Sequence, residues 1–290
     1  MLWIPFTLLA AFMQALRNAL QKQLSTDVSV AGVTLARFIW ALPLAFGYLS
    51  ALYSWQPQPV PAFTPFFLLL IVAVAVAQII GTMLMVRLFT LRNYAIGAGL
   101  AKSEAIIAAI LGVLLFSEIL SPLGWLGVSL GAAAVLLLSG ASLRQFSWPV
   151  LLLGLCCGLS FALNSLWVRQ ASLMLPLPPL YSAAWVLTLV ILVQTLLLLA
   201  FVISREPQTL RQLWQKPALT LAISGCSFLG SVGWFTAFSL ASVAMVKTLG
   251  QIEVLIMLLI SALWFKEKLQ KRALSGLVLI VLAAIAVIWA

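Results

Sequence analysis

The two halves of this chain repeat each other at a spacing of 149 residues, and this repeat limits the possible folds more than any other feature. The shift superimposes nine pairs of identical residues without a gap: Gly81 and Gly230, Phe89 and Phe238, Leu91 and Leu240, Ala95 and Ala244, Glu104 and Glu253, Phe116 and Phe265, Glu118 and Glu267, Leu120 and Leu269, Gly127 and Gly276. Two of these pairs are carboxylates. About five apolar stretches separate the members of each pair, and an odd number of membrane crossings would invert the second copy. The repeat predicts alternating access rather than catalysis.

The composition is that of an integral membrane protein. Hydrophobic residues make up 64% of the chain and charged residues 8%, whereas a soluble domain has about 25% charged residues. Runs long enough to cross about 30 Å of hydrocarbon predict ten spans, at 3–23, 29–52, 65–87, 94–116, 122–140, 149–171, 179–203, 217–239, 243–265 and 271–289. We expect an all-α fold in which two inverted five-helix repeats, residues 1–145 and 146–290, form one integrated transmembrane domain.

Basic residues gather on one set of the expected connections. Eleven lie at or near that set: Lys22, Arg87, Arg92, Arg144, Arg205, Arg211, Lys216, Lys266, Lys268, Lys271 and Arg272. The other side has only Arg169. Because positive loops stay in the cytoplasm, we expect a multi-pass protein of a bacterial-type inner (plasma) membrane with both termini in the periplasm.

Several chemistries have no support in the sequence. The chain has no histidine, no phosphate-binding GxxxxGK[ST] loop and no CxxC pair, so an ATP-driven pump, a His-based triad and a metalloenzyme are disfavoured. The net charge of +10 lies at membrane connections and does not predict nucleic-acid binding. We expect no enzyme activity, cofactor or metal, and a monomer or weak dimer in the lipid bilayer.

Charged side chains inside the expected spans are the first candidates for a functional site. Glu104 and Glu253 each lie eleventh in their spans, close to the bilayer midplane. Lys102 and Lys247 are also deep, and neither has an acidic residue three or four positions away, so an ion pair must join different helices. Gln251 follows Lys247 by one turn. Two interpretations stay open: neutralised carboxylates that fix helix packing, or protonatable groups that contact substrate in a cavity.

A polar stripe on the first span is the second candidate. Gln14, Arg17, Asn18 and Gln21 have the spacing of one helix face and predict a wet cavity or a polar helix neighbour. Arg17 and Arg37 could also extend towards the cytoplasmic interface. Softer candidates for a substrate site are Asn164, Gln78, Ser231 and Trp234, each with helix packing as the alternative role.

The repeated segments from Gly81 to Gly127 and from Gly230 to Gly276 resemble the drug/metabolite transporter superfamily, specifically its ten-helix EamA-type members. The matching motifs are "ARF" with Arg37 and the span-ending "LLFSEIL" and "LWFKEKL" with Glu118 and Glu267. The resemblance implies movement of small organic solutes such as amino acids, amines or related metabolites, commonly without ATP. Many members have a proline in spans 4 and 9, and this chain lacks it, so we expect no helix break there.

These observations favour a secondary transporter that exports small organic metabolites by alternating access, with protons as a candidate coupling ion through the midplane glutamates. We expect its cavity between spans 1, 3, 4, 6, 8 and 9. The alternatives are a membrane-embedded enzyme acting on lipid-linked substrates and a passive channel or facilitator.

Overall fold

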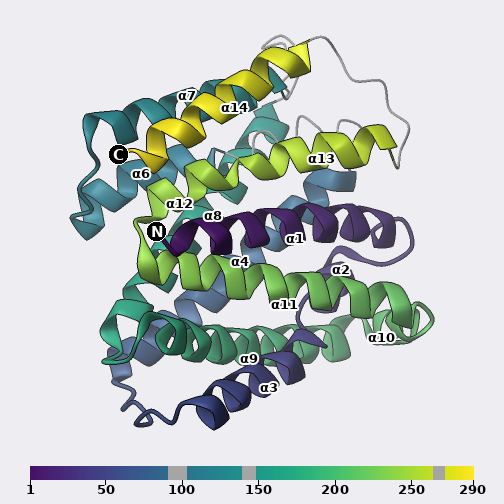
Figure 1. Cartoon of the computed structure of the whole chain (residues 1–290). Helices are drawn as coiled ribbons and strands as arrows, with labels where there is room; N and C mark the ends of the chain where they lie inside the picture. Colours follow the sequence, from purple (N-terminus) through teal and green to yellow (C-terminus); the bar gives the residue numbers. More distant parts are fainter. Residues whose placement is uncertain (91–102, 139–147, 264–271) are drawn as a thin grey trace.

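The computed structural model describes residues 1–90, 103–138, 148–263 and 272–290, and every regular element in these ranges is a helix. In chain order the helices are α1 (Trp3–Leu24), α2 (Val30–Ala36), α3 (Ala41–Trp55), α4 (Pro65–Thr90), α6 (Glu104–Phe116), α7 (Pro122–Leu138), α8 (Trp148–Met174), α9 (Pro179–Arg205), α10 (Pro207–Trp214), α11 (Pro217–Leu240), α12 (Val243–Gly250), α13 (Ile252–Leu263) and α14 (Arg272–Ile288). They pack side by side as a bundle (Figure 1). The predicted all-helical class is confirmed for the described part of the chain.

The long helices have the length and composition of membrane spans. Among the described residues five segments qualify: Val30–Trp55, Pro65–Leu88, Trp148–Met174, Pro179–Arg205 and Pro217–Leu240. Three shorter apolar helices, Glu104–Phe116, Pro122–Ala134 and Val278–Ile288, accompany them. The polar stripe that includes Gln14 and Asn18 lies on α1, which is not one of the five. The chain is a multi-pass membrane protein.

Helix packing follows the internal repeat. The most extensive contacts join α1 to α11, α4 to α8, and α7 to α14. The shift of 149 residues relates α1 to α8 and α4 to α11, so it exchanges the first two pairs and maps the third onto itself. Glycines mark equivalent contacts: a Cβ atom at Gly81 would lie 3.2 Å from the Phe161 ring of α8, and one at Gly230 would lie 3.4 Å from Met13 of α1.

The expected span 29–52 consists of two helices rather than one. Ser224 of α11 separates them, because its hydroxyl accepts a hydrogen bond from the backbone N–H of Trp40 at 3.2 Å and donates to the carbonyl of Ala36 at 2.6 Å. These are the two groups that a continuous helix would join directly, and a side chain inserted between them interrupts the helix. The expected span 29–52 therefore agrees with the candidate span Val30–Trp55, and residues 37–40 form a turn within it.

The expected span 243–265 is also interrupted. α12 ends at Gly250 and α13 begins at Ile252, and the N–H of Gln251 bonds to the carbonyl of Thr248 at 3.2 Å, the tighter spacing of a 3₁₀ turn. A Cβ atom at Gly250 would lie 2.3 Å from the Trp234 ring, so glycine permits the indole to press against this turn. The expectation that a missing proline leaves this span unbroken was therefore wrong.

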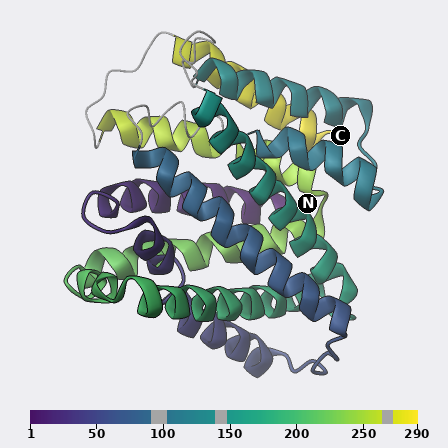
Figure 2. The same ribbon diagram turned by 180° about the vertical axis from the view of Figure 1, so that it is seen from behind.

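Both termini lie at the same end of the bundle, as the two opposite views show (Figures 1 and 2). The other end carries the basic last turns of α1, α4 and α9, together with α10, which the sequence did not predict. There Lys216 forms an ion pair with Asp27, and the Ser29 hydroxyl donates to Glu206 at 2.5 Å. These contacts fasten the α10–α11 corner to the connection between α1 and α2.

Candidate functional site

The interruption between α12 and α13 places Glu253 deep in the bundle. The eight residues of α12 rise about 12 Å, and the residues of α13 beyond Glu253 rise about 15 Å. Glu253 is fully buried, and it lies in the first turn of α13. Its repeat equivalent, Glu104, is the first residue of α6 and is 7% exposed. Each carboxylate therefore sits at the N-terminal end of a short helix, where the helix dipole stabilises negative charge.

Two amides of α1 bind the Glu253 carboxylate. The Gln14 amide donates to Oε2 at 2.6 Å, and the Asn18 amide donates to Oε1 at 2.9 Å. Arg17 donates to the Asn18 carbonyl oxygen at 2.9 Å, which orients the Asn18 amide towards Glu253. Gln14 and Asn18 are one turn apart on α1, so this part of the predicted polar stripe faces α13, whereas Gln21 donates to the carbonyl of Val33 of α2 at 3.4 Å. The first and ninth expected spans are thus joined by charge-assisted hydrogen bonds.

Lys247 and Glu104 form an ion pair between α12 and α6. The Lys247 ammonium lies 3.3 Å from Glu104 Oε2, which confirms that a deep lysine finds its partner on another helix. The same ammonium lies 4.5 Å from the centroid of Trp234 and 5.4 Å from that of Phe238, within the range of cation–π attraction. The Glu104 carboxylate and the two aromatic rings therefore together offset the cost of burying the Lys247 charge.

Trp234 links the two charged groups. Its indole N–H donates to the Gln14 carbonyl oxygen at 2.9 Å while its ring faces Lys247. A continuous chain of contacts consequently runs from Glu104 through Lys247, Trp234 and Gln14 to Glu253. It joins residues of α6, α11, α12, α13 and α1, drawn from both halves of the sequence. We call these five residues and Asn18 the central cluster.

Gln251 lies at the interruption itself. It is 1% exposed, and neither its amide nitrogen nor its amide oxygen has a hydrogen-bond partner among the described residues. A Cβ atom at Gly131 of α7 would lie 2.3 Å from its amide oxygen. A buried amide without partners is energetically costly, so Gln251 is a group that a ligand, a water molecule or another conformation of the helix would satisfy.

The remaining candidate residues in the described part of the chain form no hydrogen bond with the central cluster. Gln78 accepts a hydrogen bond from Gln194 of α9 at 2.6 Å, and Asn164 donates to the carbonyl of Val74 of α4 at 3.2 Å. Both are therefore bonded to neighbouring helices. Ser231 is buried on α11 one turn before Trp234. Lys102 and Glu267 lie outside the described residues.

The two deep arginines do not extend to the surface. Arg17 and Arg37 are each 2% exposed. Arg37 donates to the Thr82 hydroxyl of α4 at 2.7 Å, next to the interruption between α2 and α3. Of the two alternatives for these arginines, their burial among neighbouring helices supports a role inside the bundle over extension to the cytoplasmic interface.

A second, partly buried ion pair was not anticipated from the sequence. Arg169 of α8 lies 3.0 Å from Glu118 in the α6–α7 connection, and it donates to the carbonyls of Phe238 and Ala241 at 2.7 Å, at the end of α11. Burial raises the pKa of the Glu118 carboxyl above its usual value, and the Arg169 guanidinium opposes that rise. The available signal was that Arg169 is the one basic residue on its side of the expected membrane topology.

The central cluster combines two carboxylates, one ammonium and neutral amides in the interior of the bundle, and polar groups at such a depth are candidates for a functional site. Within the described ranges, no group of three or more His, Cys, Asp and Glu side chains is arranged to hold a metal ion. The arrangement is thus one of hydrogen bonds and charge pairs.

Comparison with known proteins agrees with this architecture. Residues 148–289 match the model of the EamA-like transporter family. A solved structure described only as "Crystal structure of protein" is 16% identical and has a TM-score of 0.74, with 98% of each chain covered, so it shares the fold. No curated protein sequence matches the chain significantly. Through its second half, the chain belongs to the EamA-like transporter family of the drug/metabolite transporter superfamily.

Proposed function

We propose that this protein is a secondary transporter that exports small organic metabolites, such as amino acids, amines or related compounds, by alternating access. The observation that carries the proposal is the central cluster, in which α1 of the first half holds Glu253 of the second half through Gln14 and Asn18. Polar groups in a membrane interior are costly and mark solute or proton pathways. Family membership supports transport over catalysis.

The packing supports two inverted five-helix repeats that move against each other. Exchange of the α1–α11 and α4–α8 pairs under the repeat is what a pseudo-twofold axis in the membrane plane would produce. Interruptions at residues 37–40 and at Gln251 provide positions at which a helix can bend. Discontinuous helices near the midplane are a recurring feature of solute and ion sites in transporters.

Proton coupling would act through the contacts of Glu253. When the carboxylate is ionised, it accepts hydrogen bonds from both Gln14 and Asn18. Protonation would remove the negative charge that strengthens these bonds and would weaken the attachment of α13 to α1. Glu104 is held instead by Lys247. The two glutamates therefore have different partners, and we assign coupling to Glu253 and substrate contact to Glu104 and Lys247.

The basic end of the bundle would face the cytoplasm, with both termini in the periplasm of a bacterial-type inner membrane. Lys22, Arg87, Arg205, Arg211 and Lys216 all lie at or beyond helix ends on that side. The excess of positive charge supports this orientation. A passive channel and a lipid-processing enzyme are the alternatives, and the match to a transporter family favours the transporter.

A ligand-stabilisation screen tests the proposal. The purified protein is melted with amino acids, amines and organic acids at two pH values, and at least one solute is expected to raise its melting temperature. Asn18→Ala should abolish that rise, and it should also lower basal stability because it removes a hydrogen bond from the buried Glu253 carboxylate. Asn164→Ala is the matched control, because Asn164 bonds the backbone of α4; it should lower basal stability and keep the response. A response that survives Asn18→Ala and disappears with Asn164→Ala would move the site away from α1.

A further inference from the structure

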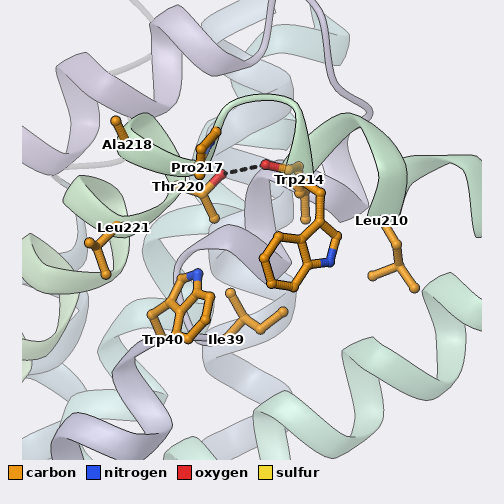
Figure 3. A pocket seen from close by; sticks show the side chains of 9 residues that line it. Ile39, Trp40, Leu210, Trp214, Pro217, Ala218, Thr220 and Leu221 are labelled. Atoms are coloured by element: carbon orange, nitrogen blue, oxygen red, sulfur yellow. Dashed lines mark hydrogen bonds between the residues drawn. The ribbon is translucent and has the colours of Figure 1, made fainter.

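An apolar pocket lies at the basic end of the bundle, outside the central cluster. It has a volume of about 250 Å³ and is bounded by the turn between α2 and α3, by α10 and by the first turn of α11. Figure 3 shows the indoles of Trp40 and Trp214 directed into it from two different elements, with Ile39 between them. Their ring centroids are 6.0 Å apart in an edge-to-face arrangement.

The position of α10 fixes the depth of this pocket. α10 joins the membrane-spanning segments Pro179–Arg205 and Pro217–Leu240, so it lies at the membrane surface. The pocket reaches Leu221, four residues into α11, and this corresponds to about 6 Å below the start of that span. Interfacial helices bury their apolar face about 5–10 Å into the boundary between head groups and acyl chains. The pocket therefore opens where the first carbons of an acyl chain lie.

The lining suits hydrocarbon rather than a polar solute. Thr220 is its one hydroxyl residue, and that hydroxyl is used within the protein, because it donates to the carbonyls of Leu213 and Lys216 at 3.3 Å and 3.0 Å. Trp214 is 65% exposed and Trp40 37% exposed, as expected for aromatic side chains at a membrane interface.

Positive charge borders the pocket. Arg211 is exposed on α10 between the lining residues Leu210 and Trp214, and its guanidinium forms no ion pair with any described residue. Lys216 immediately precedes Pro217, which lines the pocket, but its ammonium is paired with Asp27, so among the described residues Arg211 supplies the free positive charge at this edge. A guanidinium beside an apolar cavity at this depth complements a negatively charged head group above an acyl chain.

We infer that this pocket binds an anionic phospholipid, with one acyl chain between Trp40 and Trp214 and the phosphate next to Arg211. Occupancy would brace the α2–α3 turn against α10, because Ile39 and Trp40 of the turn form one wall and Leu210 and Trp214 the opposite wall. The site is separate from solute transport and does not depend on it.

Native mass spectrometry with phosphatidylglycerol and phosphatidylcholine of identical acyl chains tests the inference. The wild-type protein should retain phosphatidylglycerol preferentially, and Arg211→Gln should lower that preference about fivefold without changing phosphatidylcholine retention. Arg87→Gln is the matched control, since Arg87 is exposed at the same end of the bundle on α4, which does not line the pocket. It should leave the preference intact.

A second variant tests the acyl-chain part. Ala218→Trp places a large ring at an exposed lining position and should lower the retention of both lipids, whereas Leu229→Trp, at an exposed position of α11 away from the pocket, should not. Equal retention of the two lipids by the wild type, or equal effects of Arg211→Gln and Arg87→Gln, would overturn the inference. So would retention by Ala218→Trp that matches Leu229→Trp. Arg211 is exposed, so its variant stays informative even if Ala218→Trp folds poorly.

Discussion

Substitution of Lys247 by methionine tests the buried charge pair of the central cluster. Met keeps the length and apolar stem of the side chain but removes the ammonium, so Glu104 loses its partner at 3.3 Å and Trp234 loses the cation over its ring. Removal of one member of a buried ion pair costs about 3–5 kcal/mol, because the remaining charge is left uncompensated. The lost cation–π contact adds about 0.5–2 kcal/mol.

The assay is thermal unfolding of the purified protein in detergent. A loss of about 3–5 kcal/mol corresponds to a fall of about 6–20 °C in melting temperature, at about 2–4 °C per kcal/mol. The double variant Lys247→Met/Glu104→Gln should recover more than half of that fall, because it leaves no unpaired charge. Lys216→Met is the control, since its exposed pair with Asp27 should contribute little. A single variant as stable as the wild type, or a double variant with no recovery, would refute the pairing.

Three further predictions concern packing, pH and topology. Gly233→Ala should lower stability by about 1–3 kcal/mol because the new Cβ would lie 2.6 Å from a backbone oxygen of α1, whereas Gly225→Ala meets nothing within 4 Å and should be neutral or stabilising. The raised pKa of Glu118 favours the protonated carboxyl in the folded state, so its contribution to stability is complete at low pH and lost as pH rises through that raised pKa. Arg169→Gln removes the opposing cation, so melting temperature should fall more steeply as pH rises above the ordinary carboxyl pKa than it does in the wild type. A reporter fused after Ala290 should report the periplasm and one inserted within α10 the cytoplasm, and the reverse pattern would invert the orientation.

The sequence predicted the helical segments well because the signals for them are local. Within the described residues a helix lies in each of the ten expected ranges, although five segments have the length and composition of a membrane span. The repeat relates helix pairs that pack alike. The polar spacing on α1 predicted which face of that helix needs a polar neighbour. A lysine without an acid on its own helix face likewise predicted an ion pair between helices, although the sequence could not choose its partner.

The sequence did not reveal the structural features that depend on residues far away in the chain. Ser224 interrupts the helix at Ala36 from 188 residues away, and no local feature of residues 37–40 announces it. Asn18 and Asn164 share a local Asn-x-Leu pattern, but one binds a carboxylate and the other a backbone carbonyl. Residue type alone does not distinguish these environments. Both depend on which helix lies opposite.

The central claim is that Glu253 couples a proton to solute movement. The most direct measurement is uptake of each radiolabelled amino acid, amine and organic acid into proteoliposomes, with and without an imposed pH gradient. For at least one solute, wild-type uptake should depend on the gradient, and Glu253→Gln should abolish that dependence while counterflow persists. Asp27→Asn, an exposed acid outside the central cluster, should behave as the wild type. A Glu253→Gln variant whose uptake follows the pH gradient as the wild type does would contradict the account.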